Sequence, residues 1–110
     1  MFPGPSDTPQ SVNVTAVSST SLFMTWNPVP NIHQNGIITQ YQVEYNQTEF
    51  REVLMFSSQT VAEDTLSTML LNLEEYVTYT IRVRAYTEVG SGPYSPTEEE
   101  RTLEDGKSSN

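Results

Sequence analysis

The sequence predicts an all-β fold, an antiparallel sandwich of about seven short strands. Apolar and polar residues alternate with a period of two in several short segments, most regularly in residues 76–92, "YVTYTIRVRAYTEVGSG". No segment has apolar residues at helical spacing over the length that a helix needs, and turn-forming residues separate the alternating segments.

The first half of the chain supplies three strands. Each is a short alternating segment, and the three segments are residues 10–17, 21–26 and 40–45. In the second segment, "SLFMTW", the alternation places Leu22, Met24 and Trp26 on the inward face and Phe23 on the outward face. The stretch "NPVPNIHQNG" contains two prolines and an Asn-Gly pair and therefore predicts a loop before the third strand.

The second half supplies the remaining strands. The expected elements, in chain order, are a weak strand at residues 50–57, a loop at 61–65, an apolar strand at 66–73, the regular strand from Tyr79, and an acidic strand at 94–102. In the regular strand, Tyr79, Ile81 and Val83 share the inward face, whereas Arg82 and Tyr86 point outward.

Composition excludes several classes of function. A chain of 110 residues with a net charge of -9 is a single acidic domain, and five scattered Lys and Arg residues cannot form the basic stripe of a nucleic-acid binder. The same shortage disfavours an anionic membrane surface, and no apolar run predicts membrane insertion. The absence of Cys excludes thiol chemistry and slightly favours a reducing compartment.

The order of these residues resembles the fibronectin type III family. The resemblance is carried by Trp26, Asn35-Gly36-Ile37, Tyr41-x-Val43-x-Tyr45, Leu73, Thr78-Tyr79, Ile81-x-Val83-x-Ala85-x-Thr87-x-x-Gly90-x-Gly92 and Ser95. It implies a seven-stranded antiparallel immunoglobulin-like sandwich over residues 9–104, with a lead-in at 1–8 and a linker or tail at 105–110.

The resemblance and the alternation together predict the core. Its expected members are Trp26, Tyr41, Val43, Leu73, Tyr79, Ile81 and Val83. By resemblance, Tyr79 is the tyrosine corner, whose hydroxyl bonds to the preceding backbone. Gly90 and Gly92 are expected to supply unusual backbone angles where the last hairpin turns.

Nothing in the sequence predicts catalysis, a cofactor or a metal. His33 is the sole His and sits in the Pro/Asn loop, where we expect a solvated imidazole without the nucleophile and orienting group of a catalytic set. The run Glu98-Glu99-Glu100 is expected to protect an edge strand from pairing with other chains. Calcium binding is a weaker reading, since no Asp-x-Asp-x-Asp loop is present.

The family resemblance implies a non-catalytic spacer and protein-interaction module in the extracellular part of a cell-surface receptor or adhesion protein. "NGIITQY" and "YTIRVRAYT" more narrowly resemble repeats of receptor-type tyrosine phosphatase ectodomains. The loop "TEVGSGP" has no Arg-Gly-Asp motif, so integrin binding is not expected. Neighbouring domains are the expected partners. An intracellular muscle-type array and a ligand-binding receptor module remain alternatives.

The remaining candidate functional residues are three outward apolar side chains and two N-glycosylation sequons. Phe23, Met69 and Leu71 are expected to form a patch on one outer surface, unless a register shift of one residue turns Met69 and Leu71 inward. Asn13 and Asn46 fit the N-glycosylation pattern, a number of matches near that expected by chance. Asn46 is the preferred site, because it lies near a strand end.

Overall fold

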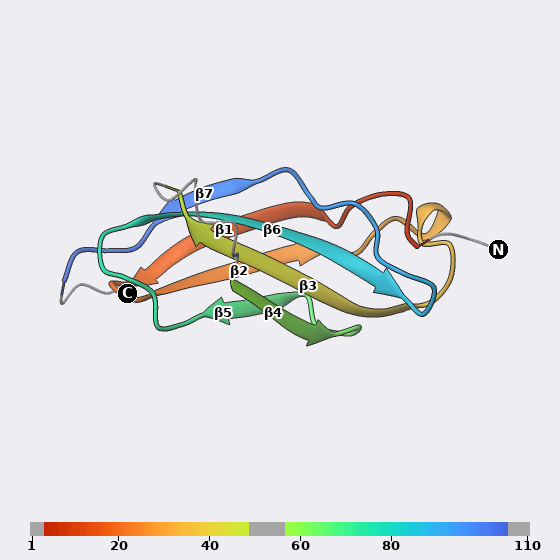
Figure 1. Ribbon diagram of the computed structural model, residues 1–110, viewed down its shortest axis with the longest axis horizontal. Coiled ribbons are helices and arrows are strands. Elements are labelled where there is room, and N and C mark those ends of the chain that lie inside the picture. The colour runs from red at the N-terminus through yellow and green to blue at the C-terminus, as the bar shows by residue number, and fades with distance from the viewer. Residues whose placement is uncertain (1–3, 49–56, 106–110) are drawn as a thin grey trace.

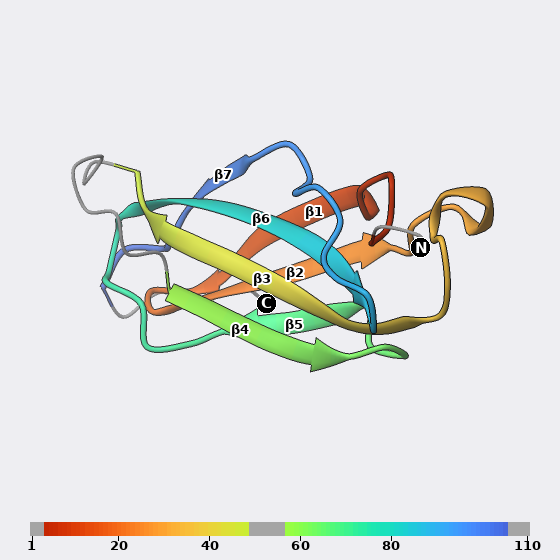
Figure 2. The same cartoon turned by 45° about the vertical axis from the view of Figure 1, so that its right-hand side comes forward.

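Two antiparallel sheets pack face to face in the computed structural model, which describes residues 4–48 and 57–105 (Figures 1 and 2). One sheet has the order β1-β2-β5, with bounds Gln10–Ser18, Ser21–Asn27 and Ser67–Leu70. The other has the order β4-β3-β6-β7, with bounds Ser57–Ala62, Ile38–Gln47, Thr78–Thr87 and Glu98–Arg101. A 3₁₀ turn, η1 at Asn31–His33, lies between β2 and β3. These elements confirm the predicted fold class.

The core lies between the sheets and is built from the inward halves of the alternating strands. In β6 every second residue from Tyr79 to Thr87 is buried, because the strand is interior to its sheet and packs on the other sheet. Trp26 is 2% exposed, and its ring centre lies 5.5 Å from that of Tyr41 at a tilted angle. The structure buries each of the expected core residues, namely Trp26, Tyr41, Val43, Leu73, Tyr79, Ile81 and Val83.

A hydrogen-bonded corner holds the loop between β5 and β6. The Tyr79 hydroxyl accepts the backbone amide of Glu74 at 2.8 Å. Thr102 follows β7 and is 1% exposed; its hydroxyl donates to the Glu74 carbonyl at 2.7 Å and accepts the Val77 amide at 3.0 Å. Two side-chain hydroxyls therefore secure this loop, and only Tyr79 was identified from the sequence.

The expectation for Gly90 and Gly92 was wrong. Neither has a positive φ; the glycine that does is Gly36, at 135°. Gly92 is constrained by a close approach instead, since a Cβ there would lie 2.8 Å from the Pro5 carbonyl oxygen. The constraint comes from the N-terminal segment, which is distant in sequence.

Several strand bounds also differ from those expected. Residues 50–56 of the weak strand lie outside the described residues, whereas β4 continues through Val61 and Ala62, which were assigned to a loop. These two residues pair with Tyr41 and Gln40 of β3. Leu66 precedes β5 and is 37% exposed, although its carbonyl accepts the Trp26 amide at 3.0 Å.

The last strand begins at Glu98 rather than at residue 94. The segment before it contains Pro93 and Pro96, which lack the amide donors of a regular ladder. Ser95, which lies between the two prolines, hydrogen-bonds to β6 in place of a regular strand. Its amide donates to the Val83 carbonyl at 2.8 Å, and its buried hydroxyl accepts the Val83 amide at 3.0 Å.

Candidate interaction surfaces

The outer face of the β1-β2-β5 sheet is a grid of side chains fixed by the strand register. One cross-strand row consists of Thr15, Phe23 and Met69, and the next of Asn13, Thr25 and Ser67. Phe23 is 37% exposed and Met69 is 40% exposed. Two apolar side chains therefore lie next to each other, and the other members of these two rows are polar.

Leu71 belongs to a different surface. It follows the end of β5, is 57% exposed, and lines a hollow with Tyr45 and Ser57, which come from the other sheet. Parity alone placed it beside Met69, but the strand ends at Leu70, and Asn72 takes a positive φ of 60°. The outward apolar pair is thus Phe23 and Met69.

The outer face of the four-stranded sheet carries a cluster of cations and rings. The guanidinium carbons of Arg82 and Arg84 lie 3.9 Å and 4.4 Å from the ring centre of Tyr94. Arg82 donates to Glu44 Oε1 at 2.7 Å from Nη2 and at 3.1 Å from Nε. Arg84 donates to Gln42 Oε1 at 2.9 Å. The polar atoms satisfy one another, so this cluster stabilises the sheet.

The cluster shifts two pKa values. Partial burial alone would raise the pKa of Glu44, but hydrogen bonds from Arg82 and Tyr94 and the positive charges of Arg82 and Arg84 together lower it. Burial, followed by the hydrogen bond to Glu44, raises the pKa of Tyr94 to about 12. The sequence predicted the outward parity of Arg82 but missed Tyr94, which was assigned to a strand and folds over the face from an irregular segment.

The end of the sandwich where the described chain begins exposes large apolar side chains. Ile32 in η1 and Ile37 before β3 are each 83% exposed, and Val89 in the turn after β6 is 47% exposed. The N-terminal segment is attached to this end, because the Ser6 amide donates to the His33 carbonyl at 2.8 Å. The His33 ring lies beside the Ser6 hydroxyl, at 3.3 Å from Nδ1.

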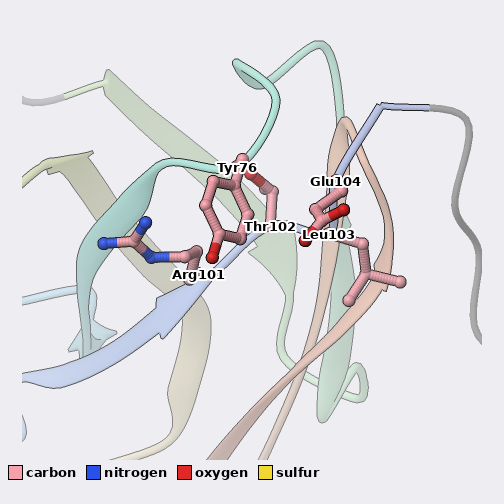
Figure 3. A pocket seen from close by; sticks show the side chains of 5 residues that line it. All are labelled: Tyr76, Arg101, Thr102, Leu103 and Glu104. Carbon is pink, nitrogen blue, oxygen red and sulfur yellow. The ribbon is translucent and has the colours of Figure 1, made fainter.

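The opposite end, where the described chain leaves β7, contains a hollow of about 550 Å³. Figure 3 shows its lining, which comes from the loop before β6 and from the end of β7: Tyr76, Arg101, Thr102, Leu103 and Glu104. Tyr76 is 53% exposed, and the Arg101 guanidinium lies 4.7 Å from its ring centre. Figure 1 shows that the described chain starts and finishes at opposite ends of the long axis. Exposed apolar side chains lie near both, Ile32 and Ile37 at one end and Tyr76 at the other.

The two sequons differ in exposure, in the reverse of the expected order. Asn13 is exposed and lies on β1, an edge strand. Asn46 is half-buried in β3, between β4 and β6, and its Oδ1 accepts the Gln47 amide at 2.8 Å. The Thr48 hydroxyl of the second sequon bonds to that of Thr80 at 2.6 Å. At this end of β3, Asn46 pairs with Thr80 of β6, so the position near a strand end does not leave its side chain fully exposed.

Among residues 4–48 and 57–105, no group of three or more His, Asp or Glu side chains is placed so that it could hold a metal ion. Glu98, Glu99 and Glu100 lie on β7, an edge of the larger sheet. In the described part of the chain, no helix is long and apolar enough to cross a bilayer.

The fold and the corner define an immunoglobulin-like β-sandwich module. The family model described as "Fibronectin type III domain" matches residues 7–101, and the chain belongs to that family. The matched domain type is non-catalytic.

Relatives and solved structures agree with this assignment. Protein sidekick-1 of Gallus gallus is 43% identical over 92% of this chain, and receptor-type tyrosine-protein phosphatase F of Mus musculus is 38% identical over 92% of it. The solution structure of the third fibronectin III domain of human KIAA0343 protein has a TM-score of 0.84 and 28% identity, and covers 97% of this chain and 90% of that one. The chain spans 5% of the length of sidekick-1 and of the phosphatase.

Proposed function

We propose that this domain is an extracellular module of a cell-surface receptor or adhesion protein, in which it spaces and orients neighbouring domains through its two ends. The observation that carries the proposal is the exposed apolar surface at each end. Ile32 and Ile37 project where the chain enters, and Tyr76 projects beside the hollow where it leaves. Apolar groups at such junctions favour contact with an adjoining domain.

The shape and the relatives support the same role. The molecule measures 50 × 33 × 18 Å, and its long axis joins the two chain exits, so each copy adds length to an array. One relative is receptor-type by name, and the match covers one small part of it. The outer-face cluster around Tyr94 is internally paired and stiffens the sheet without offering a free reactive group.

Placement outside the cell is tested by labelling. An antibody raised against the folded domain should stain intact cells that produce the whole protein, and protease added outside should remove the signal. Staining that appears only after the membrane is permeabilised would contradict the extracellular placement and favour the intracellular array.

The spacing role is tested on the domain together with the domains that flank it in its own gene. Ile32→Ser combined with Ile37→Ser should broaden the distribution of interdomain angles in small-angle scattering. The isolated domain should keep its melting temperature, because both side chains are 83% exposed. Phe23→Ser, on a side face, is the matched control and should leave the angles unchanged. An unchanged angular distribution in the double variant would contradict the role of this end.

A further inference from the structure

We propose that Asn13 is an N-glycosylation site whose first sugar packs on Phe23, so that the glycan covers the outward apolar pair Phe23 and Met69. The inference rests on the proposed extracellular placement and goes beyond it, because it assigns a modification and an occupant to one face of the sandwich. The occupant is a saccharide carried by this same chain.

The sequon has the geometry that the modification needs. Asn13 and Thr15 are both exposed and point to the outer face, while Val14 between them packs against the core. β1 is an edge strand, so one side of the Asn13 backbone has no neighbouring strand in its sheet. Its side-chain nitrogen donates to the Ser11 carbonyl over a long distance of 3.4 Å, and such a weak hydrogen bond is easily given up.

The register places an aromatic ring beside this asparagine. Thr15 pairs directly with Phe23, and Asn13 pairs with Thr25, so Phe23 is the diagonal neighbour of Asn13 on the same face. Diagonal neighbours in an antiparallel pair lie about 7–8 Å apart, within reach of a long side chain and more easily of a glycosylated one. Met69 lies directly beyond Phe23 in the same row.

The chemistry of a pyranose suits this surface. N-acetylglucosamine has an apolar face of C–H groups and a polar rim, and a C–H face packs on an aromatic ring while the hydroxyls remain in water. Phe23 and Met69 are only partly exposed, so a single sugar ring is a large enough cover for them. The polar neighbours Thr15, Thr25 and Ser67 can hydrogen-bond to the rim.

The covalent step is the ordinary transfer from a lipid-linked pyrophosphate oligosaccharide. The Asn13 side-chain nitrogen forms a bond to C1 of the first sugar, the C1–O bond to the pyrophosphate breaks, and the lipid pyrophosphate leaves with the bonding pair. The amide nitrogen loses one proton, and no atom changes oxidation state. Asn46 is the internal comparison, because its side chain is half-buried and its sequon hydroxyl is already bonded.

The test uses the chain secreted from mammalian cells behind a cleavable leader, which makes the result independent of where the parent protein resides. Peptide mass spectrometry should find a glycan on Asn13, and both Asn13→Gln and Thr15→Ala should remove it, whereas Asn46→Gln should not. Glycans should then be trimmed to a single N-acetylglucosamine. The trimmed protein should melt about 3–6 °C above Asn13→Gln.

The contact itself is tested in a second background. With Phe23→Thr the glycan should remain attached, but the difference in melting temperature should fall below about 1 °C. Nuclear Overhauser effects between sugar protons and the Phe23 ring provide a measurement that needs no variant. A bare Asn13 would overturn the site, and an equal shift in both backgrounds or an absence of these effects would overturn the contact. Failure of the surface-labelling experiment would instead overturn the extracellular placement on which glycosylation of the parent protein rests, and the secreted chain distinguishes that failure from a bare Asn13.

Discussion

Tyr79→Phe removes one oxygen from the corner and leaves the buried ring in place. That oxygen accepts the Glu74 amide at 2.8 Å, and Tyr79 is 5% exposed. Loss of one such bond destabilises the fold by about 1 kcal/mol. A loss of 1 kcal/mol corresponds to a fall in melting temperature of roughly 4–8 °C in a domain of this size.

Tyr86→Phe is the matched control, because it removes a hydroxyl from the same strand at the outward parity. The Tyr86 hydroxyl accepts from Arg84 at 2.8 Å and donates to Gln42 at 2.9 Å, but these two partners also bond to each other. The variant should therefore lose only about 0.5 kcal/mol. Urea unfolding followed by the fluorescence of Trp26, the sole Trp, measures both. If the two variants unfold at the same urea concentration and with the same slope, the inference that the Tyr79 hydroxyl contributes more stability than the Tyr86 hydroxyl is refuted.

Three further results are expected. Trp26→Ala should cost roughly 3–5 kcal/mol in urea unfolding, whereas Ile32→Ala at an exposed position should change stability by less than about 0.5 kcal/mol; similar losses would contradict the core assignment. Thr102→Val should cost about 1–2 kcal/mol and speed amide exchange at Val77, and unchanged exchange there would argue against the clamp. Because the folded pKa of Glu44 lies below its ordinary value of 4.5, its ionisation stabilises the fold above that pH and the benefit is lost as pH falls through the folded pKa. Glu44→Gln should therefore be less stable than the parent by about 1 kcal/mol at pH 7. If this difference in unfolding free energy is as large at pH 3, the ion pair between Glu44 and Arg82 is not its source.

The sequence by itself determined the class of fold and the inward rows. Alternation is a local property, and residues such as Ile81 and Val83 share a face wherever their strand is placed. The same rule placed Phe23 outward. Composition excluded nucleic-acid binding, and the order of motifs indicated the family, because these features need no knowledge of distant neighbours.

Tertiary structure decided which outward or loop residues meet. Thr102 holds the Glu74 loop only because β7 ends beside it, and Gly92 is required only because Pro5 approaches it. Tyr94 receives two guanidinium groups because a proline-containing segment folds over the sheet instead of continuing as a strand. The first two contacts join segments far apart in the chain, and the third depends on how the chain folds back after β6.

The two sequons show the same division between what the sequence determines and what the tertiary structure determines. Their patterns are equivalent in the sequence, yet Asn13 is exposed on a strand at the edge of its sheet, and Asn46 is half-buried on a strand interior to its sheet. Strand order within a sheet depends on connections between distant segments, and the alternation of a single strand carries no information about it. The register between β1 and β2, which sets Phe23 diagonally beside Asn13, is likewise a property of the assembled sheet.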